Sequence, residues 1–203
     1  MQANNDILVR KAVLSDAMEV VNIMDRNFDP EDDQRIMGTK VTTALFKMLF
    51  QLEDSFVLVA EKEKKILGYI WLQLEPLSIF KCFQNAPSLM LGVMFEVIKD
   101  FKLRLTFQLL LKQEKKDSLS IPFPIIKSIA VNRVAGIKGI GSMLVMKGQE
   151  CLAAKGIREY FVLTSINNLN AISFYNNNGF KKYQSNKVSV IFRKRMGSNK
   201  RRV

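Results

Sequence analysis

Histidine is missing from this sequence of 203 residues, and cysteine and tryptophan are scarce. Without histidine the chain has no Ser-His or Cys-His triad and no histidine zinc site, and it lacks the commonest general base. Its two cysteines, Cys82 and Cys151, are too few for a disulfide framework. Residues 1–13 contain no long apolar run of the kind found in a signal peptide. We therefore expect a cytoplasmic protein that uses no metal.

Long apolar runs are missing as well. The apolar run at residues 89–95 is far shorter than the roughly 20 residues that cross a bilayer. Apolar residues make up 48% of the chain and charged residues 25%, which is close to the average of packed globular proteins. At this length one domain is the expectation. The sequence thus predicts a single folded domain without a membrane span.

Acidic residues are outnumbered, because 31 Lys and Arg against 19 Asp and Glu give a formal net charge of +12. Six of the basic residues lie in the last eleven positions, 193–203. The chain has one tryptophan, and no aromatic side chains alternate with these basic ones, so a stacking platform for nucleic-acid bases is lacking. We predict a disordered basic tail at residues 195–203 and no specific nucleic-acid partner.

Apolar residues alternate with polar ones in some segments and recur at helical spacing in others. Two prolines, Pro122 and Pro124, make the start of one strand irregular. Ser15 and Asp16 offer N-cap oxygens to the first helix. Strands are expected at residues 7–10, 55–60, 66–74, 121–131, 159–164, 180–183 and 188–193, and further helices at 34–52, 86–100, 101–116, 141–154 and 168–177. This order predicts a mixed sheet with helices on both faces.

Three glycines, Gly136, Gly139 and Gly141, lie between a predicted strand and a predicted helix. Glycine lets the backbone approach a ligand closely, and a helix N-terminus offers free N–H groups and a positive dipole end. The glycine order reverses the dinucleotide-binding fingerprint, and Lys138 precedes Gly139 instead of occupying the end of a Walker A loop. The segment favours another kind of phosphate-binding turn, and an ordinary glycine-rich turn is the alternative.

At residues 128–142 and 168–180 the chain resembles the GNAT superfamily of acyl-CoA-dependent N-acetyltransferases. The family signature of a strand, Arg/Gln-x-x-Gly-x-Gly/Ala and a helix is matched by residues 128–131, Gly139 and Gly141, but its leading Arg or Gln falls on Gly136. The second signature, Asn-x-x-Ala-x-x-x-Tyr-x-x-x-Gly-Phe, is complete from Asn168 to Phe180. The resemblance implies an α/β fold with a mixed, mostly antiparallel central sheet, helices on both faces and a splayed pair of central strands.

The resemblance also implies a site for acetyl-CoA as co-substrate. Backbone amides of residues 137–142 would hold the diphosphate, and the strand edge at Ile129 and Val131 would border the pantetheine arm. Asn168 would hydrogen-bond that arm, and a backbone N–H near Ala130 or Val131 would stabilise the oxyanion. The implied cofactor-binding residues are Ile129, Ala130, Val131, Gly136, Ile137, Lys138, Gly139, Ile140, Gly141, Ser142, Asn168 and Tyr175.

Tyr175 is the implied general acid. A phenol with a pKa near 10 stays protonated at neutral pH and can donate a proton to a departing thiolate. The alternative role of Tyr175 is that of an aromatic core residue. The strand at 121–131 contains no Asp or Glu, so the general base stays open between Glu75, a chain of water molecules and the loop carboxylates Asp29, Glu31, Asp32 and Asp33.

We expect an acetyl transfer to a primary amine of a small molecule, with amino sugars and nucleotide-linked amino sugars as candidates, by direct attack in a ternary complex. The alternatives are an acetyltransferase of protein or peptide amines and a non-catalytic acyl-CoA-binding or interaction module. Relative to the family, one domain spans residues 1–194 and carries a helical insertion at about 76–120. The insertion could form a lid over the acceptor, a homodimer interface or a peripheral membrane contact.

Overall fold

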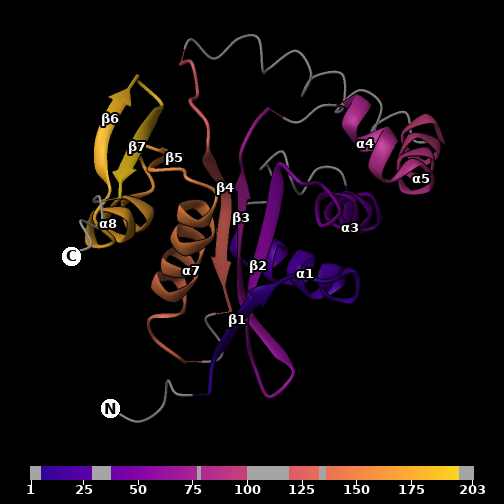
Figure 1. Cartoon of the computed structure of the whole chain (residues 1–203), viewed down its shortest axis with the longest axis horizontal. Coiled ribbons are helices and arrows are strands. Elements are labelled where there is room, and N and C mark those ends of the chain that lie inside the picture. Colours follow the sequence, from indigo (N-terminus) through magenta and orange to yellow (C-terminus); the bar gives the residue numbers. More distant parts are fainter. Residues whose placement is uncertain (1–5, 29–37, 77–78, 100–118, 133–135, 197–203) are drawn as a thin grey trace.

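A computed structural model describes residues 6–28, 38–76, 79–99, 119–132 and 136–196. Its centre is one seven-stranded sheet with the order β1-β2-β3-β4-β5-β7-β6 (Figure 1). Neighbouring strands are antiparallel except for the parallel pair of β4 and β5. The strands are β1 (Leu8–Lys11), β2 (Ser55–Lys62), β3 (Lys65–Gln73), β4 (Ile125–Val131), β5 (Glu159–Ser165), β6 (Lys181–Ser185) and β7 (Ser189–Arg195). The predicted mixed, mostly antiparallel sheet is confirmed.

The two faces of the sheet belong to two separate apolar cores. Side chains alternate between faces along a strand. On β2, Val57 and Val59 join one core, whereas Phe56 and Leu58 join the other. The side chains of β3 divide between the same two cores. The hairpin of β2 and β3 is therefore the buried centre of the molecule.

Helices cover both faces, as predicted. The helices α1 (Ala17–Asn27) and α3 (Gly38–Leu49) pack on one face, with the short helix η1 (Leu14–Asp16) leading into α1. The helices α7 (Ile140–Ala154) and α8 (Leu169–Asn177) supply side chains to the core on the opposite face (Figure 1). In the described part of the chain, no helix has the length and apolar character needed to span a membrane.

The described part of the insertion holds two helices, α4 (Ile79–Asn85) and α5 (Pro87–Lys99). The helix expected at 86–100 corresponds to α5, whereas the one expected at 101–116 lies outside the described residues. The short α4 is not predicted from the sequence, because seven apolar and polar residues are too few to display a helical period. Cys82, Ala86 and Met90 are buried in the core that α1 and α3 form. These two helices are therefore part of the packed domain.

The strand boundaries agree with the expectation to within two residues, except at the start of β4. β4 begins at Ile125, because Pro122 and Pro124 have no N–H to donate to a strand ladder. β7 continues to Arg195, one residue into the region predicted as a tail, and the Glu159 carboxylate lies 2.6 Å from its guanidinium. Residues 197–203 of that predicted tail lie outside the described residues.

The central strands β4 and β5 diverge. Only two residue pairs join them, Ile125 with Phe161 and Ile126 with Val162. The rest of β4 continues to pair with β3 on its other side. The predicted splayed strand pair is confirmed, and it leaves the β5 side of β4 without strand pairing from Ser128 to Val131.

Candidate functional site

The open edge of β4 presents backbone groups toward the gap. The Asn132 N–H donates to the Leu67 carbonyl at 2.7 Å, on the side of β3. Successive N–H groups of a strand point to opposite sides, so the amide of Ala130 also points toward β3. The amides of Ile129 and Val131 therefore point toward β5, which has already diverged. The sequence does not distinguish Ala130 from Val131 as the oxyanion donor, whereas the direction of the two amides favours Val131.

A β-bulge marks the start of the open edge. The register between β3 and β4 shifts between Trp71 and Leu72, which leaves Lys127 as the extra residue on β4. Bulges bend a strand and redirect its side chains, which gives a local reason for the divergence from β5. Just after the bulge, the buried Ser128 hydroxyl donates to the Tyr69 hydroxyl at 3.2 Å. The sequence does not predict this bulge, because Lys127 is neither a glycine nor a proline, the residue types that commonly mark one.

The glycine loop leads into the N-terminus of α7. Gly139 is the N-cap with φ +87°, and Gly136 has φ +64°, both in the left-handed region that glycine adopts without strain. No side chain caps α7. Its first amides consequently lack partners within the helix, and the positive end of the helix dipole lies at the same place. This end of α7 has the chemistry of an anion-binding site.

The other predicted residues of this loop divide into two kinds. The side chains of Lys138 and Ser142 are exposed and can reach a bound ligand. Ile140 is buried in the core beneath α7, and Ile137 packs against that core. Ile140 therefore offers a ligand only its backbone amide, whereas the half-buried Ile137 also keeps part of its side chain exposed.

The first turn of α7 packs against α8. A Cβ atom on Gly141 would lie 3.0 Å from the Phe174 ring, so the missing side chain serves helix packing as well as ligand approach. At the start of α8, the Asn168 Oδ1 accepts the Ala171 N–H at 3.0 Å. Asn168 is exposed, and its Nδ2 group is the part of the side chain that remains for hydrogen bonding to a ligand.

Tyr175 lies in the middle of an aromatic cluster. Its ring centroid is 5.3 Å from that of Phe174, 5.4 Å from Phe180 and 6.1 Å from Phe192. Burial raises the pKa of the Tyr175 phenol above its ordinary value. The packing matches a core residue, and the retained proton matches a general acid, so the geometry accommodates both roles considered from the sequence.

The candidate general bases are either far from Val131 along β4 or outside the described residues. The exposed Glu75 carboxylate lies 3.0 Å from the Lys81 ammonium, which also contacts Asp54 at 2.6 Å. Glu75 follows the end of β3 that pairs with Ile125, and Val131 is at the opposite end of β4. The loop acids Asp29, Glu31, Asp32 and Asp33 lie outside the described residues.

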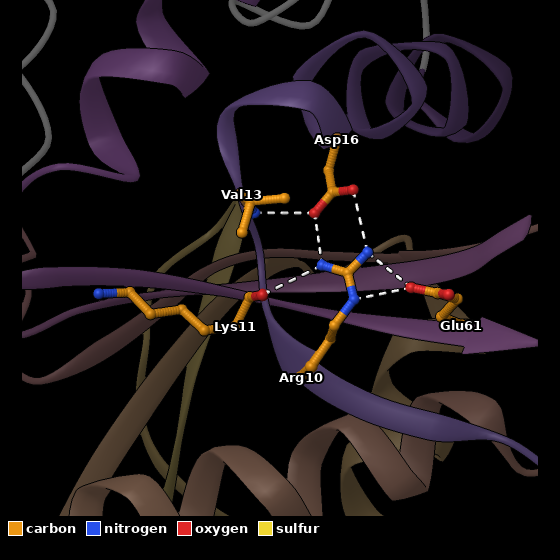
Figure 2. Close-up of polar contacts among 5 residues, drawn as sticks. All are labelled: Arg10, Lys11, Val13, Asp16 and Glu61. Carbon is orange, nitrogen blue, oxygen red and sulfur yellow. Dashed lines mark hydrogen bonds and ion pairs between the residues drawn. The ribbon is translucent and has the colours of Figure 1, made fainter. Parts of the chain in front are cut away.

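Arg10 joins β1, β2 and the start of α1 (Figure 2). Its guanidinium donates to Asp16 at 2.6 and 3.0 Å and to Glu61 at 2.7 Å. Asp16 also accepts the Val13 N–H at 2.8 Å. Burial by itself would raise the pKa of Asp16, but the hydrogen bonds from Arg10 and Val13 outweigh burial and lower it. The Asp16 carboxylate thus binds Val13 and Arg10 and does not cap α1 with its side chain, contrary to the expectation.

Residues 107–180, which include the glycine loop, Asn168 and Tyr175, match the model of the acetyltransferase (GNAT) family. This segment of the chain has the sequence pattern of a GNAT acetyltransferase domain. No curated protein sequence matches the chain at a significant level.

Solved structures share the GNAT fold over nearly the whole chain. A GNAT-family protein from Desulfovibrio desulfuricans is 16% identical with a TM-score of 0.60, over 94% of this chain and 99% of that one. The protein yncA from Salmonella typhimurium, with its cofactor acetyl-CoA, is 13% identical with a TM-score of 0.60, over 97% of each chain. PaiA N-acetyltransferase from Thermoplasma acidophilum, in complex with coenzyme A, is 16% identical with a TM-score of 0.56, over 93% of this chain and 98% of that one. At these identities the likeness concerns the fold alone.

Proposed function

We propose that this GNAT domain transfers an acetyl group from acetyl-CoA to a primary amine of a small molecule. The observation that carries the proposal is the open edge of β4 beside the uncapped N-terminus of α7. An extended pantetheine arm can pair with an exposed strand edge, and a diphosphate suits the free amides of a helix N-terminus. Structures of the same fold from Salmonella typhimurium and Thermoplasma acidophilum contain acetyl-CoA or coenzyme A.

Val131 is our candidate oxyanion donor. When the amine attacks the thioester carbonyl, negative charge develops on the carbonyl oxygen, and an N–H fixed in a strand can stabilise that charge. The Val131 amide points to the open side, whereas the Ala130 amide points to β3. Of the two amides considered from the sequence, only that of Val131 has a favourable direction.

Tyr175 is our candidate proton donor to the departing thiolate. Its raised pKa keeps the phenol protonated across the working pH range. In the proposed reaction the amine nitrogen forms a bond to the carbonyl carbon, and the carbon-sulfur bond breaks. The Tyr175 proton then passes to the sulfur, and a water chain removes the proton that the amine loses.

The acceptor class is an amino sugar or a nucleotide-linked amino sugar in our proposal. The test is incubation of the protein with acetyl-CoA and a panel of amino sugars, nucleotide-linked amino sugars, polyamines and peptides, with release of free thiol as the readout. We expect thiol release with an amino-sugar acceptor above the rate of acetyl-CoA hydrolysis. Release with peptides alone would move the acceptor to proteins, and a chain that binds no acyl-CoA in calorimetry would contradict the enzyme assignment.

A second candidate function is binding of acyl-CoA without turnover. Two observations favour it: Gly136 occupies the position of the family's Arg or Gln, and β4 contains no carboxylate. This function predicts calorimetric binding of acetyl-CoA with no thiol release for any acceptor on the panel. A single amine that accelerates thiol release excludes it.

A further inference from the structure

A cavity of about 610 Å³ opens between the start of α1, the turn from β2 to β3, and the end of β4. Its polar lining consists of Ser15, Asp16, Glu19, Lys64, Lys65 and Asn132. Only Asn132 adjoins the open edge of β4 described above. The cavity contains both acidic and basic side chains, so its preference depends on which of them are already occupied.

The acidic side chains of this cavity have partners. Asp16 receives the Arg10 fork and the Val13 N–H. Glu19 accepts a hydrogen bond from the Asn22 amide at 3.3 Å. The carboxylate oxygens therefore have reduced capacity for a new ligand, and the Arg10 guanidinium compensates the charge of Asp16.

Three of the residues that line the cavity, Ser15, Lys64 and Lys65, have hydrogen-bond donors without a partner among the described residues. Within the described residues, neither Lys64 nor Lys65 has an ion pair or a side-chain hydrogen bond, and the Ser15 hydroxyl has no hydrogen bond either. Arg10 compensates the charge of Asp16, so two unpaired ammonium groups stand against the single carboxylate of Glu19, and this balance favours an anion. Two adjacent ammonium groups on one turn suit the several oxygens of a phosphate.

The turn between β2 and β3 holds Lys64 in a backbone conformation that lysine rarely adopts. Lys62 pairs with Lys65, and the two residues between them, Glu63 and Lys64, have φ of +49° and +63°. Such two-residue turns favour Asn-Gly, because side chains other than Asn, Asp and Gly are disfavoured in the left-handed region. The chain thus keeps a lysine where asparagine or glycine would cost less, and that lysine lines the cavity.

The place of the cavity indicates which phosphate it meets. Asn132 follows Val131 directly, and its bond to Leu67 fixes it beside β3. If the pantetheine arm follows the edge of β4 toward the glycine loop, the nucleotide of the cofactor lies beyond that strand end. We propose that Lys64 and Lys65 bind the 3′-phosphate of coenzyme A. This inference rests on the proposed function, since it takes acetyl-CoA as the ligand.

The test compares coenzyme A with 3′-dephospho-coenzyme A by calorimetry, on the wild type and on the double variant Lys64→Asn, Lys65→Gln. Asparagine tolerates the left-handed φ, so the turn is expected to stay folded. We expect the Kd for coenzyme A to rise roughly ten- to a hundred-fold, as for the loss of hydrogen bonds to a charged group. The Kd for 3′-dephospho-coenzyme A should change less than about twofold, within ordinary scatter for a distant charge.

The matched control is the double variant Lys181→Gln, Lys182→Gln. It removes the same amount of charge from two adjacent exposed lysines on β6. An equal loss of affinity for both ligands, or an equal loss in the control, would overturn the 3′-phosphate site. Adenosine 3′,5′-bisphosphate separates this failure from that of the proposed function. If it binds in a manner that depends on the two lysines while acetyl-CoA is never turned over, the phosphate site stands and the acetyl transfer fails. If the wild type binds neither the bisphosphate nor coenzyme A, both are wrong.

Discussion

The half of the molecule that we propose binds acetyl-CoA, β4 to β7 with α7 and α8, is called the cofactor half here, and it differs from the α4 and α5 region in what determines its structure. In the cofactor half, backbone features decide: a bulge, left-handed glycines and an uncapped helix end. In α5, side-chain packing decides, because Met90 and Val93 are buried on one face. The opposite face exposes apolar side chains at helical spacing, Leu91, Met94, Phe95 and Ile98. Backbone conformation therefore shapes the proposed cofactor site, whereas side-chain packing holds α5 in place and leaves one of its faces apolar and exposed.

The largest expected effect concerns Tyr175. Tyr175→Phe removes one hydroxyl and leaves the aromatic cluster nearly filled, so kcat should fall roughly ten- to a thousand-fold while the affinity for acetyl-CoA stays nearly constant. Because burial raises the pKa of this phenol, kcat of the wild type should not decline through tyrosine ionisation up to about pH 10. The rate of thiol release measures kcat of the variants, and its pH profile measures the pH dependence of the wild type. Tyr183→Phe, on the exposed strand β6, is the control, and equal kcat in both variants would assign Tyr175 to the core alone.

A smaller effect is expected at the two ends of α7. Gly139→Val and Gly156→Val both place a β-branched side chain at a left-handed φ, +87° and +78°. Only Gly139 adjoins the proposed diphosphate site, so its variant should raise the Kd for acetyl-CoA roughly ten- to a hundred-fold. Calorimetry on the folded fraction of each variant makes the comparison. If both variants bind acetyl-CoA equally well, the diphosphate lies elsewhere.

Outside the cofactor half, Asp16→Asn tests the Arg10 cluster. The lowered pKa of Asp16 means that its charged form stabilises the fold above its ordinary pKa of 3.8, and this stabilisation is lost as pH falls through the folded-state pKa. We expect a loss of about 1–3 kcal/mol in the free energy of unfolding at pH 7. The difference from wild type should shrink in urea titrations below pH 4. The exposed Asp6→Asn is the control, and a difference that does not depend on pH would exclude the charge as its cause.

The smallest effect is expected on the exposed face of α5. Leu91→Gln and Ile98→Gln replace side chains that are 60% and 58% exposed, so each should change the free energy of unfolding by about 0.5 kcal/mol or less. Val93→Ala, on the buried face, should cost about 1–3 kcal/mol. Urea unfolding of the three variants measures the contrast. Equal losses on both faces would mean that the apolar stripe is covered in solution. A deletion of α4 and α5 would not isolate the role of this exposed face, because Cys82 and Met90 belong to the main core and would be lost with it.

The sequence could predict those parts of the site that depend on residue type. Gly139 is needed for a left-handed N-cap and Asn168 for a helix cap, and both are recognisable from spacing. The nearly continuous apolar runs of β2 and β3 likewise predict strands that are buried on both faces. The direction of the Val131 amide could not be predicted, because it depends on the register with β3. The approach of Lys64 and Lys65 to Asn132 depends on how the hairpin turn meets the end of β4, which no local pattern encodes.

Amide hydrogen exchange along β4 tests the central claim most directly, namely that acetyl-CoA pairs with the open edge of this strand. With saturating acetyl-CoA, the amides of Ile129 and Val131 should exchange roughly ten-fold or more slowly, because they gain a hydrogen-bond partner. The Ala130 amide already points to β3 and should exchange at nearly the same rate with and without the ligand. Unchanged exchange at Ile129 and Val131, under conditions where calorimetry reports full binding, would contradict the placement of the cofactor in the gap between β4 and β5.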